Sequence, residues 1–151
     1  MKIKNSYWGI VALLLLPFLF MTSCKKEEDP VVVEKSTKIT GKATLQAGTP
    51  GDLGNAQVAI YSSVVDWNAY QPVKIADDVN GSGAKITFVF NDVVPGNYYM
   101  DVWVDNDRSG DWSADDFVGW VGSGLLSAPA LSPFMVAEGK TVNKDIQCVV
   151  F

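Results

Sequence analysis

Apolar and polar residues alternate along much of the chain beyond residue 37. A period of two is typical of β-strands that bury one face, because successive side chains of a strand point to opposite sides. In residues 38–45, for example, Ile39, Ala43 and Leu45 fall on one face. The alternation predicts strands over residues 38–45, 56–61, 85–90, 97–104, 117–121, 134–136 and 142–151.

Turn-forming residues separate these runs, among them the cluster 48–54 and the pair Pro95-Gly96. No stretch shows an amphipathic helical period of useful length. Short strands joined by turns indicate an all-β fold, here a single Ig-like β-sandwich of about seven strands over residues 38–151. The roughly 115 residues of this segment are an ordinary size for one domain.

The first 23 residues have the pattern of a secretory signal peptide. Lys2 and Lys4 precede an apolar run that is shorter than the about 20 residues that cross a membrane comfortably. The run ends in Met-Thr-Ser before Cys24, which resembles a bacterial lipobox. We therefore expect residues 1–23 to be removed and Cys24 to carry a lipid anchor, the alternative being an uncleaved anchor helix with an incidental Cys.

Residues 24–37 are the expected lipidated Cys and a flexible tether, which spans very roughly 20 Å as a coil. Cys24 is followed by two lysines and three acidic residues. This order is similar to the surface-export signals of some Gram-negative lipoproteins, and it implies the outer face of the outer membrane. If the charges only keep the segment solvated, the periplasmic face is the alternative.

The chain contains no His. This removes Ser-His-Asp and Cys-His catalysis and the usual zinc sites. Once Cys24 is lipidated, Cys148 has no partner for a disulfide, and a free Cys in an apolar strand is usually a core residue. Hydrolysis by paired carboxylates is the enzymatic alternative, and a non-catalytic protein is favoured.

Acidic residues outnumber basic ones. Loss of the leader removes two lysines and leaves 10 basic and 17 acidic side chains, which changes the net charge from −5 to −7. An acidic surface disfavours nucleic acid and anionic lipid as partners. It favours divalent cations, or neutral ligands such as sugars.

Three segments together resemble the carboxypeptidase regulatory-like family. They are Ile-Thr-Gly-Lys-Ala-Thr from Ile39, Gly-Asn-Ala-Gln-Val-Ala-Ile-Tyr from Gly54, and Phe-Val-Phe-Asn-Asp-Val-Val-Pro-Gly-Asn-Tyr-Tyr-Met-Asp-Val from Phe88. The resemblance implies a transthyretin-like sandwich and a non-catalytic module, often of carbohydrate-active or surface proteins. The chain departs from the family in a long insertion after the strand at Tyr98, and we expect the function to lie there.

The insertion begins with an acidic loop, residues 105–116, whose spacing is similar to an EF-hand-type calcium loop. The predicted ligands are the side chains of Asp105, Asp107, Ser109 and Asp116 and the backbone carbonyl of Asp111, with Ser113 or a water at the ninth position. Gly110 stands sixth, where such a loop bends sharply. We expect a structural calcium ion of modest affinity, about 10⁻⁴–10⁻³ M as in extracellular modules.

Two residues depart from that pattern, since Ser109 replaces Asp or Asn and Asp116 replaces the longer Glu. The alternative is an acidic surface turn held by Asx hydrogen bonds. Against it, six carboxylates and one cation, Arg108, lie between Asp101 and Asp116. Crowding like charges costs free energy unless a cation offsets it.

Aromatic residues suggest a second site. If Tyr98 faces the core, then Tyr99 and Trp103 face outward with Asp101. Exposed aromatic rings beside carboxylates can stack on sugars, so the candidate ligand-binding residues are Tyr99, Trp103, Trp67, Tyr70 and Trp120. The alternative is that these rings cover the second face or open edge of the sandwich.

These features predict a surface-anchored, calcium-stabilised binding or adhesion module with a glycan as candidate ligand. The alternative is an accessory lipoprotein of an outer-membrane assembly that binds another protein, for example through an exposed strand edge. An enzyme is the least favoured class, because a small sandwich offers little cleft and the acids cluster as ligands would.

Overall fold

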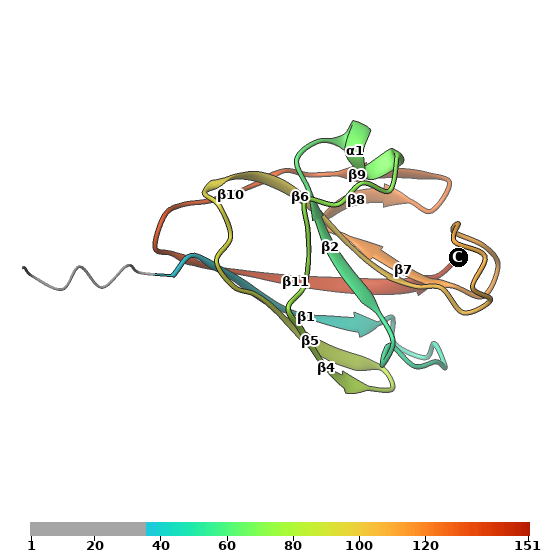
Figure 1. Cartoon of the computed structure of the whole chain (residues 1–151). Helices are drawn as coiled ribbons and strands as arrows, with labels where there is room; N and C mark the ends of the chain where they lie inside the picture. The colour runs from blue at the N-terminus through green and yellow to red at the C-terminus, as the bar shows by residue number, and fades with distance from the viewer. Residues whose placement is uncertain (1–35) are drawn as a thin grey trace, which may run out of the picture. The chain divides into compact units, whose positions relative to one another are not determined.

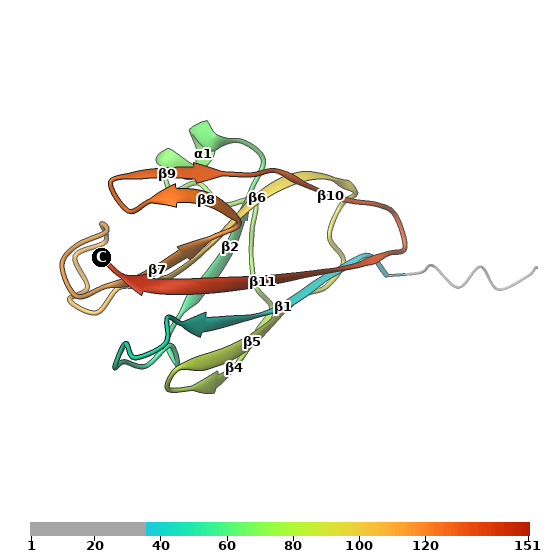
Figure 2. The same ribbon diagram turned by 180° about the vertical axis from the view of Figure 1, so that it is seen from behind.

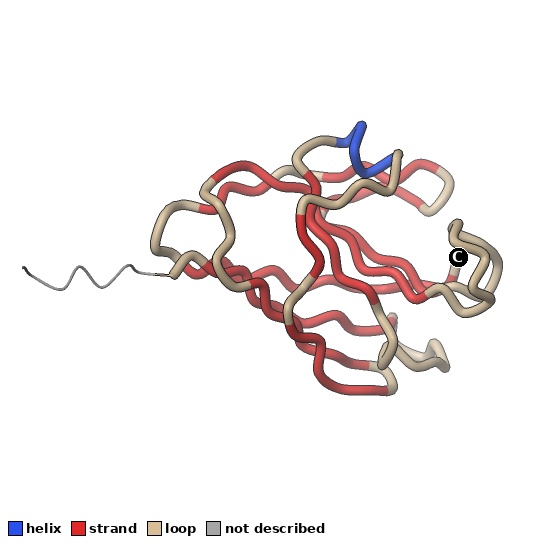
Figure 3. The backbone as a smooth tube through the Cα atoms, in the orientation of Figure 1, coloured by secondary structure: helices blue, strands red, loops and turns tan. Residues whose placement is uncertain are grey.

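The computed structural model describes residues 36–151, which form an all-β domain with one short helix (Figures 1 and 3). In chain order the strands are β1 (Lys38–Leu45), β2 (Gln57–Tyr61), β3 (Lys74–Ile75), β4 (Asp78–Ser82), β5 (Lys85–Phe90), β6 (Gly96–Val104), β7 (Phe117–Trp120), β8 (Gly122–Leu125), β9 (Ala128–Leu131), β10 (Phe134–Val136) and β11 (Thr141–Val150), and the helix α1 (Val64–Asn68) follows β2. The predicted leader, Cys24 and the tether up to residue 35 lie outside the described residues.

Nine strands form one mixed sheet in the order β3-β2-β6-β7-β11-β1-β5-β4, with β10 also paired to β6. The sheet curls so that β4, β5, β1 and β11 make one layer and β3, β2, β6 and β7 the other (Figures 1 and 2). The two layers are joined where β7 pairs with β11, through Val118–Val149 and Phe117–Val150. The pairing of β1 with β11 is parallel, and the other pairings are antiparallel.

The core lies between these layers and is built from alternate strand positions. Ile39, Phe88, Phe90, Met100 and Ile146 are all at most 3% exposed. Fully burying one such side chain contributes about 1.5–3 kcal/mol to folding. The predicted β-sandwich is therefore confirmed, with the core formed by the faces that the alternation indicated.

The strand that lies beside β6 is interrupted. β7 pairs with the C-terminal half of β6 and β10 with its N-terminal end, both antiparallel. Between them the chain leaves the sheet at Val121, whose N–H still donates to the carbonyl of Met100 at 3.0 Å, and forms the β8–β9 hairpin. The hairpin lies near α1 on the outside of the domain (Figure 1).

The face of β2, β6 and β7 that points away from the core is called the outer face here. Helix α1 covers part of it, and Ser63 begins this helix, because its hydroxyl accepts a hydrogen bond from the N–H of Asp66 at 3.1 Å. The helix brings Trp67 into a small second cluster with Ala59 and Tyr61.

The expected count of about seven strands was too low. All seven predicted strands are present, but β3, β4, β8 and β9 were not predicted. β3 has two residues, β4 reads Asp-Val-Asn-Gly-Ser, and the hairpin strands consist of small residues, glycine, proline and leucine. These strands have almost no buried face, so no apolar–polar alternation marks them in the sequence.

Candidate functional site

The acidic loop, residues 105–116, connects β6 to β7. Each of Asp105, Asp107 and Asp116 offers a carboxylate oxygen within 4.8 Å of the other two. Asp105 follows the end of β6 and Asp116 precedes β7, and the pairing of Val104 with Phe117 holds these two strand ends together. The sheet thus fixes the first and last predicted ligands, and the loop folds Asp107 back toward them.

The intermediate ligand positions join the same cluster through hydrogen bonds. The hydroxyl of Ser109 donates to the carbonyl of Asp111 at 2.8 Å. The hydroxyl of Ser113 donates to Asp107 Oδ2 at 3.0 Å and lies 3.4 Å from Asp116 Oδ2. All six predicted positions, from the first to the twelfth, therefore lie in one network of oxygen atoms, with Asp111 contributing its backbone carbonyl rather than its exposed side chain.

Asp116 is the most buried of the three clustered carboxylates, since its side chain is fully buried. Its Oδ1 accepts from the N–H of Asn106 at 2.8 Å. Its Oδ2 accepts from the N–H of Ser113 at 3.0 Å and from the indole N–H of Trp103 at 3.1 Å. Because N–H groups already occupy both oxygens, Asp116 can give a cation one oxygen more readily than the bidentate pair that Glu supplies in EF-hand loops.

The backbone of the loop turns where the sequence indicated. Gly110 has a φ of 82°, a conformation that glycine adopts without steric cost, and its N–H donates to Asp105 Oδ2 at 3.0 Å. Hydrogen bonding from Ser109, and then from the hydroxyl of Ser113, lowers the pKa of the Asp107 carboxyl. The loop thus favours the ionised form of Asp107.

The chemistry of this donor set fits a hard cation. The converging atoms are carboxylate, hydroxyl and carbonyl oxygens, which calcium prefers, and the cluster contains neither nitrogen nor sulfur ligands. Asp105, Asp107, Ser109 and Asp116 would hold the ion by side chains, and Asp111 by its carbonyl.

The predicted outward set on β6 does lie on the outer face, but most of it is covered. Asp101 is 3% exposed and Trp67 is 9% exposed. Trp67 is therefore a packing residue, and its assignment as a ligand-binding candidate is corrected, because α1 lays its ring over Asp101 and its N–H donates to Asp101 Oδ2 at 2.8 Å. Tyr99 and Trp103 are half-buried.

Asp101 is a buried carboxylate with hydrogen-bond donors but no basic side chain among its described partners. Besides Trp67, the hydroxyl of Tyr61 donates to it at 3.3 Å. Burial raises the pKa of Asp101 to about 7, against the opposing effect of these hydrogen bonds. Burial and the nearby Asp101 charge also raise the pKa of Tyr61.

Aromatic rings form a continuous cluster on the outer face. Trp112, from the acidic loop, packs edge-on against Trp67 at 5.4 Å and against Phe151 at 5.9 Å, and it stacks on Trp120 at 6.2 Å. Tyr70, 43% exposed, lies 5.8 Å from the ring of Trp103. The alternative interpretation of these rings, as cover for the second face of the sandwich, thus fits Trp67, whereas Tyr70 is exposed.

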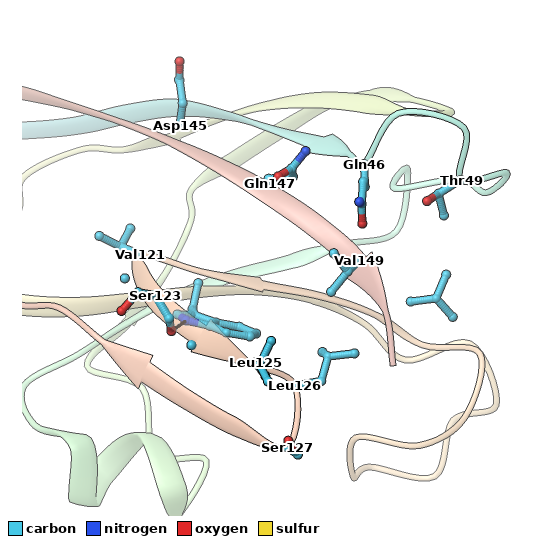
Figure 4. A pocket seen from close by; sticks show the side chains of 14 residues that line it. Gln46, Thr49, Val121, Ser123, Leu125, Leu126, Ser127, Asp145, Gln147 and Val149 are labelled. Carbon is cyan, nitrogen blue, oxygen red and sulfur yellow. Dashed lines mark hydrogen bonds between the residues drawn. The ribbon is translucent and has the colours of Figure 1, made fainter.

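Trp120 has a different setting, because it borders a cleft of about 900 Å³. The cleft lies between β11 and the β8–β9 hairpin, and Gln46 and Thr49 from the turn after β1 lie at one end (Figure 4). Gln147 and Val149 face it from β11, and Leu125 from the hairpin. Sequence reasoning missed the glutamines, since nothing in the local pattern brings residues 46, 125 and 147 together.

Cys148 is fully buried in the core, and burial raises the pKa of its thiol to about 12. It is a packing residue, as the sequence suggested.

Comparison of the chain with protein-family models, with curated proteins and with solved structures found no match. Within residues 36–151, no helix is long and apolar enough to cross a membrane. The acidic loop, the aromatic cluster and the cleft are the features that bear on function.

Proposed function

We propose that this protein is a lipid-anchored, calcium-stabilised and non-catalytic binding module that acts at the bacterial surface. The observation that carries the proposal is the convergence of the loop oxygens, with three carboxylates inside 4.8 Å and Ser109, Asp111 and Ser113 bonded into the same network. Three carboxylates this close repel one another, and a divalent cation would offset that cost.

The acidic loop and the N-terminal end of the described chain lie at opposite ends of the domain. The described chain enters the domain at Ser36, beside the start of β1 and β11, and the acidic loop lies at the other end of β11 (Figure 1). At about 3.3 Å per residue, the ten residues of β11 separate these ends by about 30 Å. The described chain therefore begins at the end of the domain opposite the loop and the adjoining cleft.

The carboxylates of the domain favour binding over hydrolysis. Hydrolysis of a glycoside uses two carboxylic groups at the substrate. Of the carboxylates in the described part of the chain, one lines the cleft, Asp145, and it pairs with Lys42 at 3.0 Å. Asp116 and Asp101 are buried and held by N–H and O–H donors, which suits structural roles.

A protein ligand is the second candidate, in which the chain is an accessory subunit of an outer-membrane assembly. It is favoured by the exposed side chain of Leu125, 74% exposed near the tip of the β8–β9 hairpin. The strand β4, which pairs only with β5 among the described residues, offers an edge for β-augmentation.

Calorimetric titration with Ca²⁺ tests the cation site, with Asp107→Asn and Asp111→Asn as a matched pair. Both variants remove one charge from the loop, but only Asp107 offers a side-chain oxygen to the cluster. We expect Asp107→Asn to weaken binding at least tenfold and Asp111→Asn to change it much less. If the unmodified protein shows no heat and no melting shift at about 10 mM Ca²⁺, tenfold above the weak end of extracellular sites, the calcium site is excluded.

Cys24→Ser tests the anchor. Metabolic labelling with a radioactive fatty acid should mark the unmodified protein and not the variant, and the variant should remain unprocessed. Protease treatment of intact cells then distinguishes the outer surface, where the domain is accessible, from the periplasmic face. A labelled Cys24→Ser variant would contradict the lipoprotein assignment.

A further inference from the structure

The cleft between β11 and the β8–β9 hairpin exists because the chain leaves the sheet after β7. β7 pairs with β11 only through Val118 and Phe117, and beyond Trp120 the chain turns into the hairpin rather than continuing beside β11. Gly119 permits the close approach at this junction, since a Cβ there would lie 2.7 Å from the carbonyl oxygen of Gln147. The hairpin therefore forms one wall and β11 the other (Figure 4).

Trp120 gives the cleft a supported aromatic surface. Its ring stacks on Trp112 with an interplanar angle of 24°, and its N–H donates to the carbonyl of Ser123 at 2.8 Å. With its N–H bonded and a neighbouring ring behind it, Trp120 is held in one orientation. A preorganised ring binds a flat apolar surface at little cost in side-chain entropy.

Polar side chains also line the cleft, and most of them are exposed. Within residues 36–151, no hydrogen bond is formed by the side-chain amides of Gln46 and Gln147 or by the hydroxyls of Thr49, Ser123 and Ser127. Amides both donate and accept, as hydroxyls do. The cleft therefore offers both kinds of hydrogen bond beside an apolar surface.

The charge of the cleft selects its ligand. Among residues 36–151 no lysine or arginine lines it, and the one carboxylate that does, Asp145, turns away from the interior and pairs with Lys42 at 3.0 Å (Figure 4). An anionic ligand would meet no counter-charge in a domain that is itself acidic, and a cationic ligand would meet one carboxylate that is already paired. The environment suits a neutral molecule.

We propose that this cleft binds a neutral saccharide, with a sugar ring stacked on Trp120 and its hydroxyls bonded to Gln147 and Gln46. The proposal rests on the proposed function as a binding module and names its ligand class. A volume of about 900 Å³ is near the upper end of the 300–1,000 Å³ that ligand sites span, so the cleft has room for more than one sugar ring.

Calorimetric titration tests the proposal on the full-length protein, in calcium buffer and in a detergent without a sugar headgroup. The probes are four neutral hexasaccharides, made of α-1,4-glucose, β-1,4-glucose, β-1,3-glucose and β-1,4-mannose, and one anionic oligogalacturonate. Trp120→Ala and Gln147→Ala remove the two main contacts. Gln57→Ala is the matched control, because Gln57 is an exposed glutamine on β2 outside the cleft.

We expect at least one neutral probe to bind, and both cleft variants to weaken that binding at least tenfold while Gln57→Ala leaves it unchanged. If circular dichroism shows that Trp120→Ala does not fold, saccharide binding by Gln147→Ala alone tests the proposal. Failure of all neutral probes, equal binding by Gln147→Ala, or tighter binding of the anionic probe would each overturn the proposal. The calcium-dependent melting shift, measured on the same samples, reports on the proposed function independently.

Discussion

The indole N–H of Trp103 donates to Asp116 Oδ2 at 3.1 Å, which links the outer face of β6 to the last carboxylate of the acidic loop. Trp103 is one of the residues whose position on an outward strand face suggested ligand binding. Through this hydrogen bond Trp103 also has a structural role, because it holds the fully buried carboxylate of Asp116 in the cluster with Asp105 and Asp107. Loss of this tryptophan would therefore perturb the loop.

Trp103→Phe keeps an aromatic ring beside Tyr70 but removes the N–H that donates a hydrogen bond to Asp116. A hydrogen bond to a charged group contributes about 1.5–3 kcal/mol, so we expect a loss of stability of that order together with weaker calcium binding. Chemical denaturation and calcium titration measure the two effects. Trp120→Phe is the control, because the N–H that it removes donates to a neutral carbonyl. Loss of such a hydrogen bond costs about 0.5–1.5 kcal/mol of stability, and the calcium affinity should not change.

Asp101→Asn tests the buried carboxylate under Trp67. Burial raises the pKa of Asp101 from 3.8 to about 7, so the folded state binds a proton that the unfolded state releases between these pH values. The stability associated with this proton is fully present below about pH 4 and is lost as the pH rises through about 7.

Asparagine remains neutral, and its amide can still accept from Trp67 and donate to Tyr61. We therefore expect Asp101→Asn to match the unmodified protein near pH 4 and to exceed its stability at pH 8, by an amount on the order of a few kcal/mol. Urea unfolding at several pH values measures the difference in the free energy of unfolding between the two proteins. The contributions of the other carboxylates are common to both proteins and cancel in this difference. Parallel pH curves for the two proteins would contradict the prediction, because they would show that folding does not shift the pKa of Asp101.

Gly119→Ala tests the junction between β7 and β11. The added Cβ would lie 2.7 Å from the backbone oxygen of Gln147 and 2.8 Å from Ile146 Cγ2, and the backbone cannot move away without opening the sheet. We expect destabilisation of about 1–3 kcal/mol, as for an overpacked core, in a denaturant titration. Gly96→Ala is the comparison, because its Cβ would meet only ordinary contacts at 3.6 Å, and it should cost clearly less.

Trp112 lies in the acidic loop and stacks on Trp120. If calcium binding orders the loop, the environment of Trp120 at the cleft should therefore change as well. We expect calcium to change the intrinsic tryptophan fluorescence, and Trp112→Phe to reduce that change by at least half. A fluorescence change of full size in Trp112→Phe would place the responding tryptophan elsewhere.

The strands that pack the core were predictable because burial on one face imposes a period of two on the sequence. β1, β5 and β10 have the predicted bounds, and β2, β6, β7 and β11 differ by one residue at one or both ends. The alternation contains no information on strands that bury little. β8 and β9 were therefore missed, and with them the wall of the cleft.

The acidic loop was the most predictable part of the candidate site, because its ligand positions follow one another within 12 residues and the glycine bend is local. The outer face was less predictable. Alternation placed Asp101 and Trp103 on that side of β6, but it could not reveal that α1 brings Trp67 over Asp101, since the helix has only five residues and no helical period.

The sequence by itself determined the all-β class, the faces of the core strands and the spacing of the predicted ligands in residues 105–116. Each of these depends on neighbours along the chain. The tertiary structure decided which aromatic rings are covered, that Asp116 is buried beneath Trp103, and that Gln46, Trp120 and Gln147 border one cleft. Those relations depend on how the sheet curls and where the strand beside β6 is interrupted, and residues 46, 120 and 147 meet only after that folding has occurred.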